Sequence, residues 1–326
     1  MLDDLPRVAL ASLPTPFHRL DRFGEALGAE VWIKRDDAGP IGLAGNKVRK
    51  LEYVLAEARD QGADTIVIIG AEQSNAARAT AAACAQIGLR CVLVLSGDEP
   101  RSPAGNLLLD RLFGAEVHFA GDVGWAELWE ASQRVGEELR AEGATPYTLP
   151  AGASSPLGAC GFVRGWQELA EQLAAERVDA GSLYFASSSC GTCAGLLLGR
   201  AMGGDTGPQL QAIGVAPDVV PDVPGYIAGL AAGAAELIGA DVEIPPPAID
   251  MDHLGEGYGI PTPECLEAIR LLARTEGIVC DPVYSGKALA ALVAHARQGA
   301  APAVFWHTGG YHALFAPRFG DAVVGR

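Results

Sequence analysis

Lysine is scarce in this chain, and one lysine stands where a chemical role would explain it. The sequence contains four lysines among 24 basic residues, and Lys47 follows Gly45 and Asn46 at the start of a helical apolar repeat. A cation at a helix N-terminus is mildly unfavourable because of the helix dipole, and forming an imine removes that charge. Lys47 is therefore a candidate for Schiff-base chemistry with a carbonyl compound, and an exposed lysine at a helix start is the simpler alternative.

A second candidate pair, Ser74 and Asn75, follows an apolar run and opens an Ala-rich helix pattern. Ser and Asn are common N-cap residues, so capping alone would explain them. Free N–H groups and short polar side chains at a helix start also bind carboxylate or phenolate oxygens. Both interpretations of this pair remain open at the level of sequence.

Residues 187–192 are small and lie between an apolar strand pattern and an Ala/Gly/Leu-rich helix pattern. Backbone N–H groups in such a turn can surround an anion, and the helix dipole adds attraction. The segment matches neither a Walker A sequence nor GxGxxG. We interpret it as a phosphate-binding turn. The alternative is a redox role for the CxxC pair Cys190 and Cys193, while no second cysteine pair lies nearby to complete a metal site.

The C-terminal third adds two tyrosines and a threonine. Tyr258 lies between two glycines, and Tyr284 follows Asp-Pro-Val. Thr308 follows an apolar strand pattern and precedes two glycines, so we expect its hydroxyl at the end of a strand. Each tyrosine could instead be an ordinary core residue. His307 is either a general base or a capping residue.

Strand and helix patterns alternate along the chain, which predicts an α/β fold with open, twisted and largely parallel sheets in two domains. Ligands of such folds gather at the carboxyl ends of the strands, where all four segments above lie. Strands are predicted at 30–34, 65–69, 90–95, 116–119, 182–187, 210–215 and 303–306, and helices at 47–61, 75–87, 106–113, 127–142, 162–177, 192–202, 262–276 and 285–298.

Composition excludes several classes of protein. A net charge of −16 argues against nucleic-acid binding, which requires a basic surface. The acidic start is unlike a signal peptide, and the Ala/Gly-rich stretch 227–240 is too short to cross a bilayer. Seven cysteines, an odd number, predict reduced thiols and a cytoplasmic location. The charged run 34–37 is expected to be solvated or locally paired.

Taken together, these segments resemble one family. The chain is similar to the pyridoxal-phosphate (PLP) enzymes of the tryptophan-synthase-β fold, called fold type II, in the group of D-cysteine desulfhydrase and 1-aminocyclopropane-1-carboxylate (ACC) deaminase. The resemblance covers nearly the whole chain. It rests on the segments 13–16, 33–37, 45–52, 73–75, 257–259, 276–278, 281–284 and 307–310.

The resemblance implies a role for each candidate. Lys47 would hold PLP as a Schiff base, Asn75 would bond its ring hydroxyl, and Thr308 would meet its pyridine nitrogen. The phosphate would lie against Ser188, Ser189, Cys190, Gly191 and Thr192. Ser74, Tyr258 and Tyr284 would act on the substrate. The resemblance also implies a homodimer, with a large PLP-binding domain of residues 1–49 and 161–326 and a smaller inserted domain of residues 50–160.

The implied activity is β-elimination on a small amino acid, giving a keto acid, ammonia and a leaving group such as sulfide. The substrate-facing positions depart from the family, because Ala76 stands where desulfhydrases have His and deaminases have Gln. The alternatives are therefore ACC deamination, an L-cysteate sulfo-lyase-like activity, a pathway-specific member with a divergent substrate, and a PLP-binding homologue without catalysis. No metal site is expected.

Overall fold

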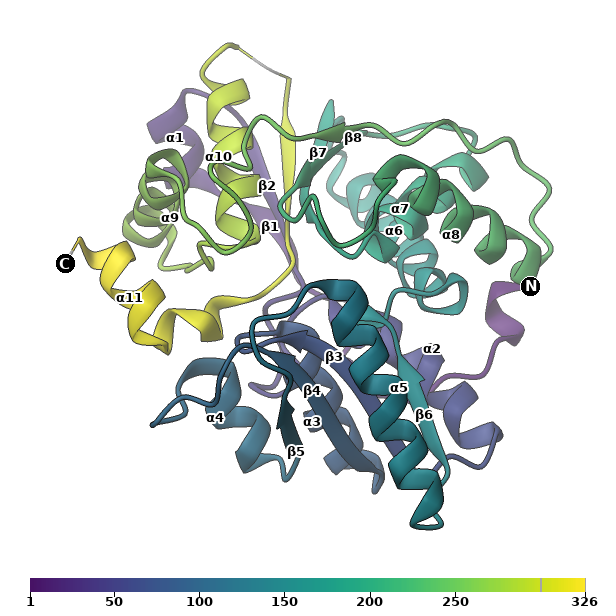
Figure 1. The fold of residues 1–326 in the computed structure, drawn as a ribbon. Coiled ribbons are helices and arrows are strands. Elements are labelled where there is room, and N and C mark those ends of the chain that lie inside the picture. Colours follow the sequence, from purple (N-terminus) through teal and green to yellow (C-terminus); the bar gives the residue numbers. More distant parts are fainter. Residues whose placement is uncertain (300, 326) are drawn as a thin grey trace.

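The structure, a computed structural model, describes residues 1–299 and 301–325 and contains two open twisted sheets (Figure 1). The larger sheet has the strand order β1-β2-β10-β7-β8-β9, and only β1 runs antiparallel to its neighbour. Its strands are β1 (Phe17–Arg19), β2 (Val31–Arg35), β7 (Ser182–Ser187), β8 (Gln209–Gly214), β9 (Ile249–Asp250) and β10 (Ala303–His307).

Helices cover both faces of this sheet (Figure 1). One face packs against α1 (Asp21–Leu27), α9 (Pro263–Glu276) and α10 (Ser285–Ala296), and the other against α6 (Pro156–Glu176), α7 (Gly191–Met202) and α8 (Val223–Ile238). The strand sequences require this arrangement, since successive side chains point to opposite faces. Val304 and Trp306 enter the core beside α6 and α7, whereas Phe305 enters the core beside α10, and all three are fully buried.

The smaller sheet is all parallel, with the order β5-β4-β3-β6. Its strands are β3 (Thr65–Ala71), β4 (Arg90–Ser96), β5 (Glu116–Phe119) and β6 (Pro146–Leu149). Ile66 and Ile68 pack against α2 (Lys47–Asp60) and α3 (Asn75–Ile87), while Val67 and Ile69 pack against α5 (Trp125–Ala141). A continuous apolar run is what a strand buried on both faces needs. The helix α4 (Gly105–Leu112) packs beside α3.

The predicted α/β fold with largely parallel sheets is confirmed, and the predicted elements lie close to the observed ones. The main difference in extent is α6, which begins at Pro156, with Ser155 as its cap, rather than at residue 162. The elements that the patterns did not indicate are mostly short or peripheral. They are β1, α1, β6, α8, β9, α11 (Pro317–Val324) and three 3-10 helices at Leu2–Asp4, Ala151–Ala153 and Tyr311–Phe315.

The charged run 34–37 is not solvated, because Lys34, Asp36 and Asp37 are buried and Arg35 is half-buried, whereas the expected local pairing is found for Arg35 and Asp37. Its charges are matched by ion pairs of Lys34 with Glu168, Arg49 with Asp36, and Arg35 with Asp37. Only the last pair is local in sequence. The other partners come from α6 and α2, and the sequence pattern could not place those helices against β2. Within the described residues, no helix combines the length and hydropathy needed to cross a membrane.

Candidate functional site

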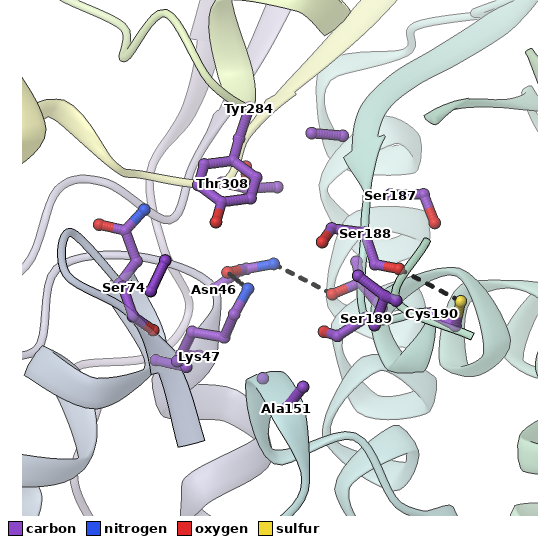
Figure 2. A pocket seen from close by; sticks show the side chains of 18 of the residues that line it. Asn46, Lys47, Ser74, Ala151, Ser187, Ser188, Ser189, Cys190, Tyr284 and Thr308 are labelled. Atoms are coloured by element: carbon purple, nitrogen blue, oxygen red, sulfur yellow. Dashed lines mark hydrogen bonds between the residues drawn. The ribbon is translucent and has the colours of Figure 1, made fainter. Parts of the chain in front are cut away.

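One pocket lies where the carboxyl ends of β3, β7 and β10 face each other between the two sheets. Every residue predicted for the site lines this pocket except Gly191, the residue that follows Cys190 in the chain. Figure 2 shows Lys47 and Asn46 on one side of the pocket, Ser188 and Ser189 opposite them, and Tyr284 and Thr308 above. The pocket therefore joins loops that are far apart in sequence, around Lys47, Ser188 and Thr308.

Lys47 is the first residue of α2, as predicted, and its amine is held rather than free. Its Nζ donates to Asn46 Oδ1 at 2.9 Å, and Asn46 Nδ2 donates to Thr192 Oγ1 at 3.0 Å (Figure 2). Burial lowers the pKa of Lys47 to about 8, and the nearby Arg78 guanidinium adds to this effect while Asp281 opposes it. At neutral pH about a tenth of the amine is therefore neutral and nucleophilic, far more than for a lysine of ordinary pKa.

The loop before Lys47 lies directly against the loop after β10. The Asn46 N–H donates to the Thr308 carbonyl oxygen at 3.0 Å. A Cβ placed on Gly309, whose φ is +93°, would lie 2.6 Å from the Cα of Gly45, so the two backbones touch where side chains are absent. The positions of Thr308 and Lys47 are consequently fixed relative to each other.

The turn between β7 and α7 has the form of an anion-binding turn. Cys190 caps α7 in the left-handed region, with φ +69°, which is uncommon for a residue with a side chain. The first turn of α7 contributes N–H groups and the positive end of the helix dipole. Gly152, opposite, leaves room for Ser189, because a Cβ there would lie 2.0 Å from Ser189 Oγ.

A second buried lysine, Lys50, reaches the same turn and was not predicted. Its Nζ donates to Ser154 Oγ at 2.9 Å, and a Cβ added to Gly191 would lie 2.9 Å from that Nζ. Burial lowers the pKa of Lys50 well below its ordinary value, with a further contribution from Lys47. A phosphate at the adjacent turn would favour the charged form of Lys50, so this lysine is suited to bind one. Its spacing of three residues from Lys47, on one helix face, was a signal in the sequence.

Ser74 caps a helix as one interpretation of the sequence expected, and both Ser74 and Asn75 line the pocket. Ser74 caps α3, accepting from the Ala77 N–H at 3.2 Å, and also lines the pocket. Asn75 Oδ1 accepts from Asn106 Nδ2 at 3.0 Å. Ala76 is 4% exposed and lines the pocket without a polar group, so the wall here is apolar where the sequence lacks the family's His or Gln.

The two predicted tyrosines form a pair at the pocket. The hydroxyl groups of Tyr258 and Tyr284 are hydrogen-bonded to each other, and Trp125 packs edge-on against Tyr258 with 6.2 Å between ring centroids. Burial raises the pKa of both phenols, which therefore keep their protons at neutral pH. Asp281, not predicted, holds the turn in place by accepting from the Tyr284 N–H at 2.7 Å.

The alternative roles considered from sequence are disfavoured. His307 is fully buried, with Nδ1 accepting from the Gly309 N–H at 3.1 Å and Nε2 donating to the Val279 carbonyl at 2.9 Å, so it supports the loop and does not face the pocket. Burial raises the pKa of Cys190 to about 11 and of Cys193 to about 12. Redox chemistry needs a thiolate, which these values suppress.

Comparison with known proteins gives matches that cover nearly the whole chain. A family model described as "Pyridoxal-phosphate dependent enzyme" matches residues 8–309. The chain is 39% identical over 327 residues to a Pyrococcus horikoshii protein provisionally named as an ACC deaminase, covering 99% of this chain and 97% of that protein. It is 39% identical over 329 residues to D-cysteine desulfhydrase of Serratia proteamaculans, covering 97% of each. A crystal structure of an ACC deaminase homologue superposes with a TM-score of 0.90 at 37% identity, covering 99% of this chain and 97% of that one.

Proposed function

Because this chain belongs to the pyridoxal-phosphate dependent enzymes, we propose that it catalyses β-elimination on a small amino acid in the manner of D-cysteine desulfhydrase. The products would be a keto acid, ammonia and a leaving group such as sulfide. The observation that supports this most directly is the convergence of Lys47, Asn75, Thr308 and the β7–α7 turn on one pocket. The family, the fold and the need for PLP are confirmed.

The residues present fit PLP in charge and in spacing. A partly neutral Lys47 suits attachment of its aldehyde, and the α7 N-terminus with Lys50 suits its phosphate. Ser188, Ser189, Cys190, Gly191 and Thr192 would surround that phosphate. Asn75 would bond the ring hydroxyl and Thr308 the ring nitrogen, where a hydroxyl supplies a hydrogen bond but no charge. When bound, the cofactor supplies the electron sink that makes the substrate's α-proton acidic.

The chain's own groups would then perform the proton transfers. Lys47 Nζ, whose pKa is lowered to about 8 by burial, would accept the proton from the substrate's α-carbon when it is in its neutral form. Ser74 retains an O–H donor after capping α3 and would bind the substrate carboxylate. The Tyr258–Tyr284 pair, protonated at neutral pH, would give a proton to the departing group. Trp125 would limit the access of water from the α5 side.

The remaining assignments are proposals of the same kind. We propose a cytoplasmic homodimer and a division into a large domain of residues 1–49 and 161–326 and a smaller inserted domain of residues 50–160. The division is supported by the smaller sheet, whose strands all come from the stretch between Thr65 and Leu149. Size-exclusion chromatography with light scattering tests the dimer, and a mass of one chain would contradict it.

The decisive experiment reconstitutes the protein with PLP and measures keto acid release from D-cysteine, L-cysteate and ACC side by side. Turnover of D-cysteine supports the proposal. Turnover of ACC alone supports ACC deamination, the activity after which the similar crystal structure is named. In Lys47→Ala, the visible absorbance of lysine-bound cofactor should be lost. A clean wild-type protein that shows this absorbance but turns over none of the three would favour a divergent substrate.

A further inference from the structure

Behind the pocket, Asn75 is held by a side chain that itself touches no pocket space. Asn106, from α4, is fully buried and donates through Nδ2 to Asn75 Oδ1 at 3.0 Å. The same Nδ2 donates to the Gln73 carbonyl oxygen at 2.8 Å, and Asn106 Oδ1 accepts from Arg78 Nε at 3.0 Å. A chain of hydrogen bonds thus runs from a buried guanidinium to Asn75.

The direction of this chain follows from groups that have a single hydrogen-bonding role. Arg78 Nε can only donate, and the Gln73 carbonyl oxygen can only accept. Exchanging the two ends of the Asn106 carboxamide would set donor against donor and acceptor against acceptor, at the cost of leaving buried polar groups unpaired. Asn106 must therefore donate from its NH₂ group to Asn75, and Asn75 must accept with its side-chain oxygen.

Because its oxygen accepts from Asn106, the NH₂ group at the other end of the Asn75 carboxamide is available to donate to a partner in the pocket. We propose that Arg78 and Asn106 are positioning residues that orient the Asn75 carboxamide as a hydrogen-bond donor to the ring oxygen of the bound cofactor, and so favour the ionised form of that oxygen. This inference rests on the proposed function. The inference goes beyond the proposed function because it assigns a positioning role to two residues, Arg78 and Asn106, that lie outside the binding pocket.

Arg78 is suited to orient Asn106 because its buried guanidinium is held in place by several hydrogen bonds. It is 1% exposed and also donates to the carbonyl oxygens of Gly42 and Ala44, in the loop that leads to Lys47. One buried cation thus fixes both the loop before Lys47 and the orientation of Asn75. Hydrogen bonds from a charged donor are the stronger kind, and linked bonds polarise one another.

Two variants of Asn106 separate orientation from packing. In Asn106→Asp, the new carboxylate keeps the size of the side chain and can pair with Arg78, but it can only accept. Asn75 is then expected to rotate its NH₂ group away from the pocket. The dissociation constant for PLP should rise about 10- to 100-fold, and the visible absorbance of the ionised ring oxygen should fall. Asn106→Ala removes the hydrogen bond to Asn75 without reversing the Asn75 carboxamide, so the affinity for PLP should fall less than in Asn106→Asp.

A packing role predicts the opposite order, because Ala leaves a cavity and Asp does not. The inference is overturned if Asn106→Ala binds PLP more weakly than Asn106→Asp, or if Asn106→Asp keeps wild-type affinity and absorbance. The matched control is Thr80→Val, an isosteric change at a fully buried position of the same helix α3, which should leave both quantities unchanged.

A double-mutant cycle with Asn75→Ala completes the test and applies even if Asn106→Asp does not fold. If Asn106 acts through Asn75, then Asn106→Ala should weaken PLP binding little further once Asn75 is alanine. Fully multiplicative losses would overturn the inference. A wild-type protein that binds no PLP would instead contradict the proposed function, and this outcome is distinguished by the wild-type titration alone.

Discussion

The amine of Lys47 lies 2.9 Å from the side-chain oxygen of Asn46, its own N-cap neighbour. Asn46 continues to Thr192 at the start of α7, so the proposed cofactor lysine and the proposed phosphate turn are joined by one side chain. This link crosses 146 positions of sequence. It orients the amine toward the pocket before any ligand binds, and such preorganisation lowers the cost of binding.

The depressed pKa of Lys47 leads to a prediction about cofactor attachment. Only the neutral amine attacks an aldehyde, and burial has lowered the pKa of Lys47 from 10.5 to about 8. The attachment rate should therefore fall about tenfold for each pH unit below this value and level off above it. Stopped-flow absorbance after mixing apoprotein with PLP measures the rate. A rate that keeps rising toward pH 10 would show an ordinary lysine.

Lys50 should recognise the phosphate and not the pyridine ring. Its Nζ lies beside the α7 N-terminus, bonded to Ser154. In Lys50→Met the affinity for PLP should fall about 10- to 100-fold, as expected for a lost charged hydrogen bond. Binding of pyridoxal, which lacks the phosphate, provides the matched control and should change little. Equal losses for both ligands would indicate a role in folding alone.

Tyr258 and Tyr284 should act as one unit, because their hydroxyl groups are bonded to each other. Either change to Phe should lower kcat about 100-fold or more while cofactor content stays the same. The double variant should be little worse than the single ones, since groups that act together are not additive. Steady-state kinetics on PLP-loaded protein gives the answer, and full activity in both single variants would contradict the role.

Gly309 should tolerate no side chain. Its φ is +93°, and a Cβ would lie 2.6 Å from the Cα of Gly45. Gly309→Ala is expected to destabilise the protein by about 1–3 kcal/mol and to weaken PLP binding by moving Thr308 away from Lys47. Gly229→Ala is the control, because nothing lies within 4 Å of its Cβ position in α8, and it should be neutral or stabilising. Thermal unfolding compares the two.

Much of the fold followed from local patterns in the sequence. The continuous apolar runs at β3 and β10 require sheets covered on both faces, and the structure has one at each place. Ser74, as a helix cap after a strand, indicated the start of α3, and it also lines the pocket. Short elements such as β9, with two residues, are too brief to show any periodicity.

The sequence by itself determined which residues open helices and follow strands, because caps, glycines and apolar periods act over a few neighbouring positions. The sequence therefore predicted Lys47, Asn75 and Thr308 as residues of the site. Only the tertiary structure decided that Lys50 and Asn106 approach the same pocket, that His307 supports a loop, and that the charges around Asp36 are buried. Those features depend on contacts between segments distant in sequence, and burial, which sets the pKa of Lys47, exists only after the chain has packed.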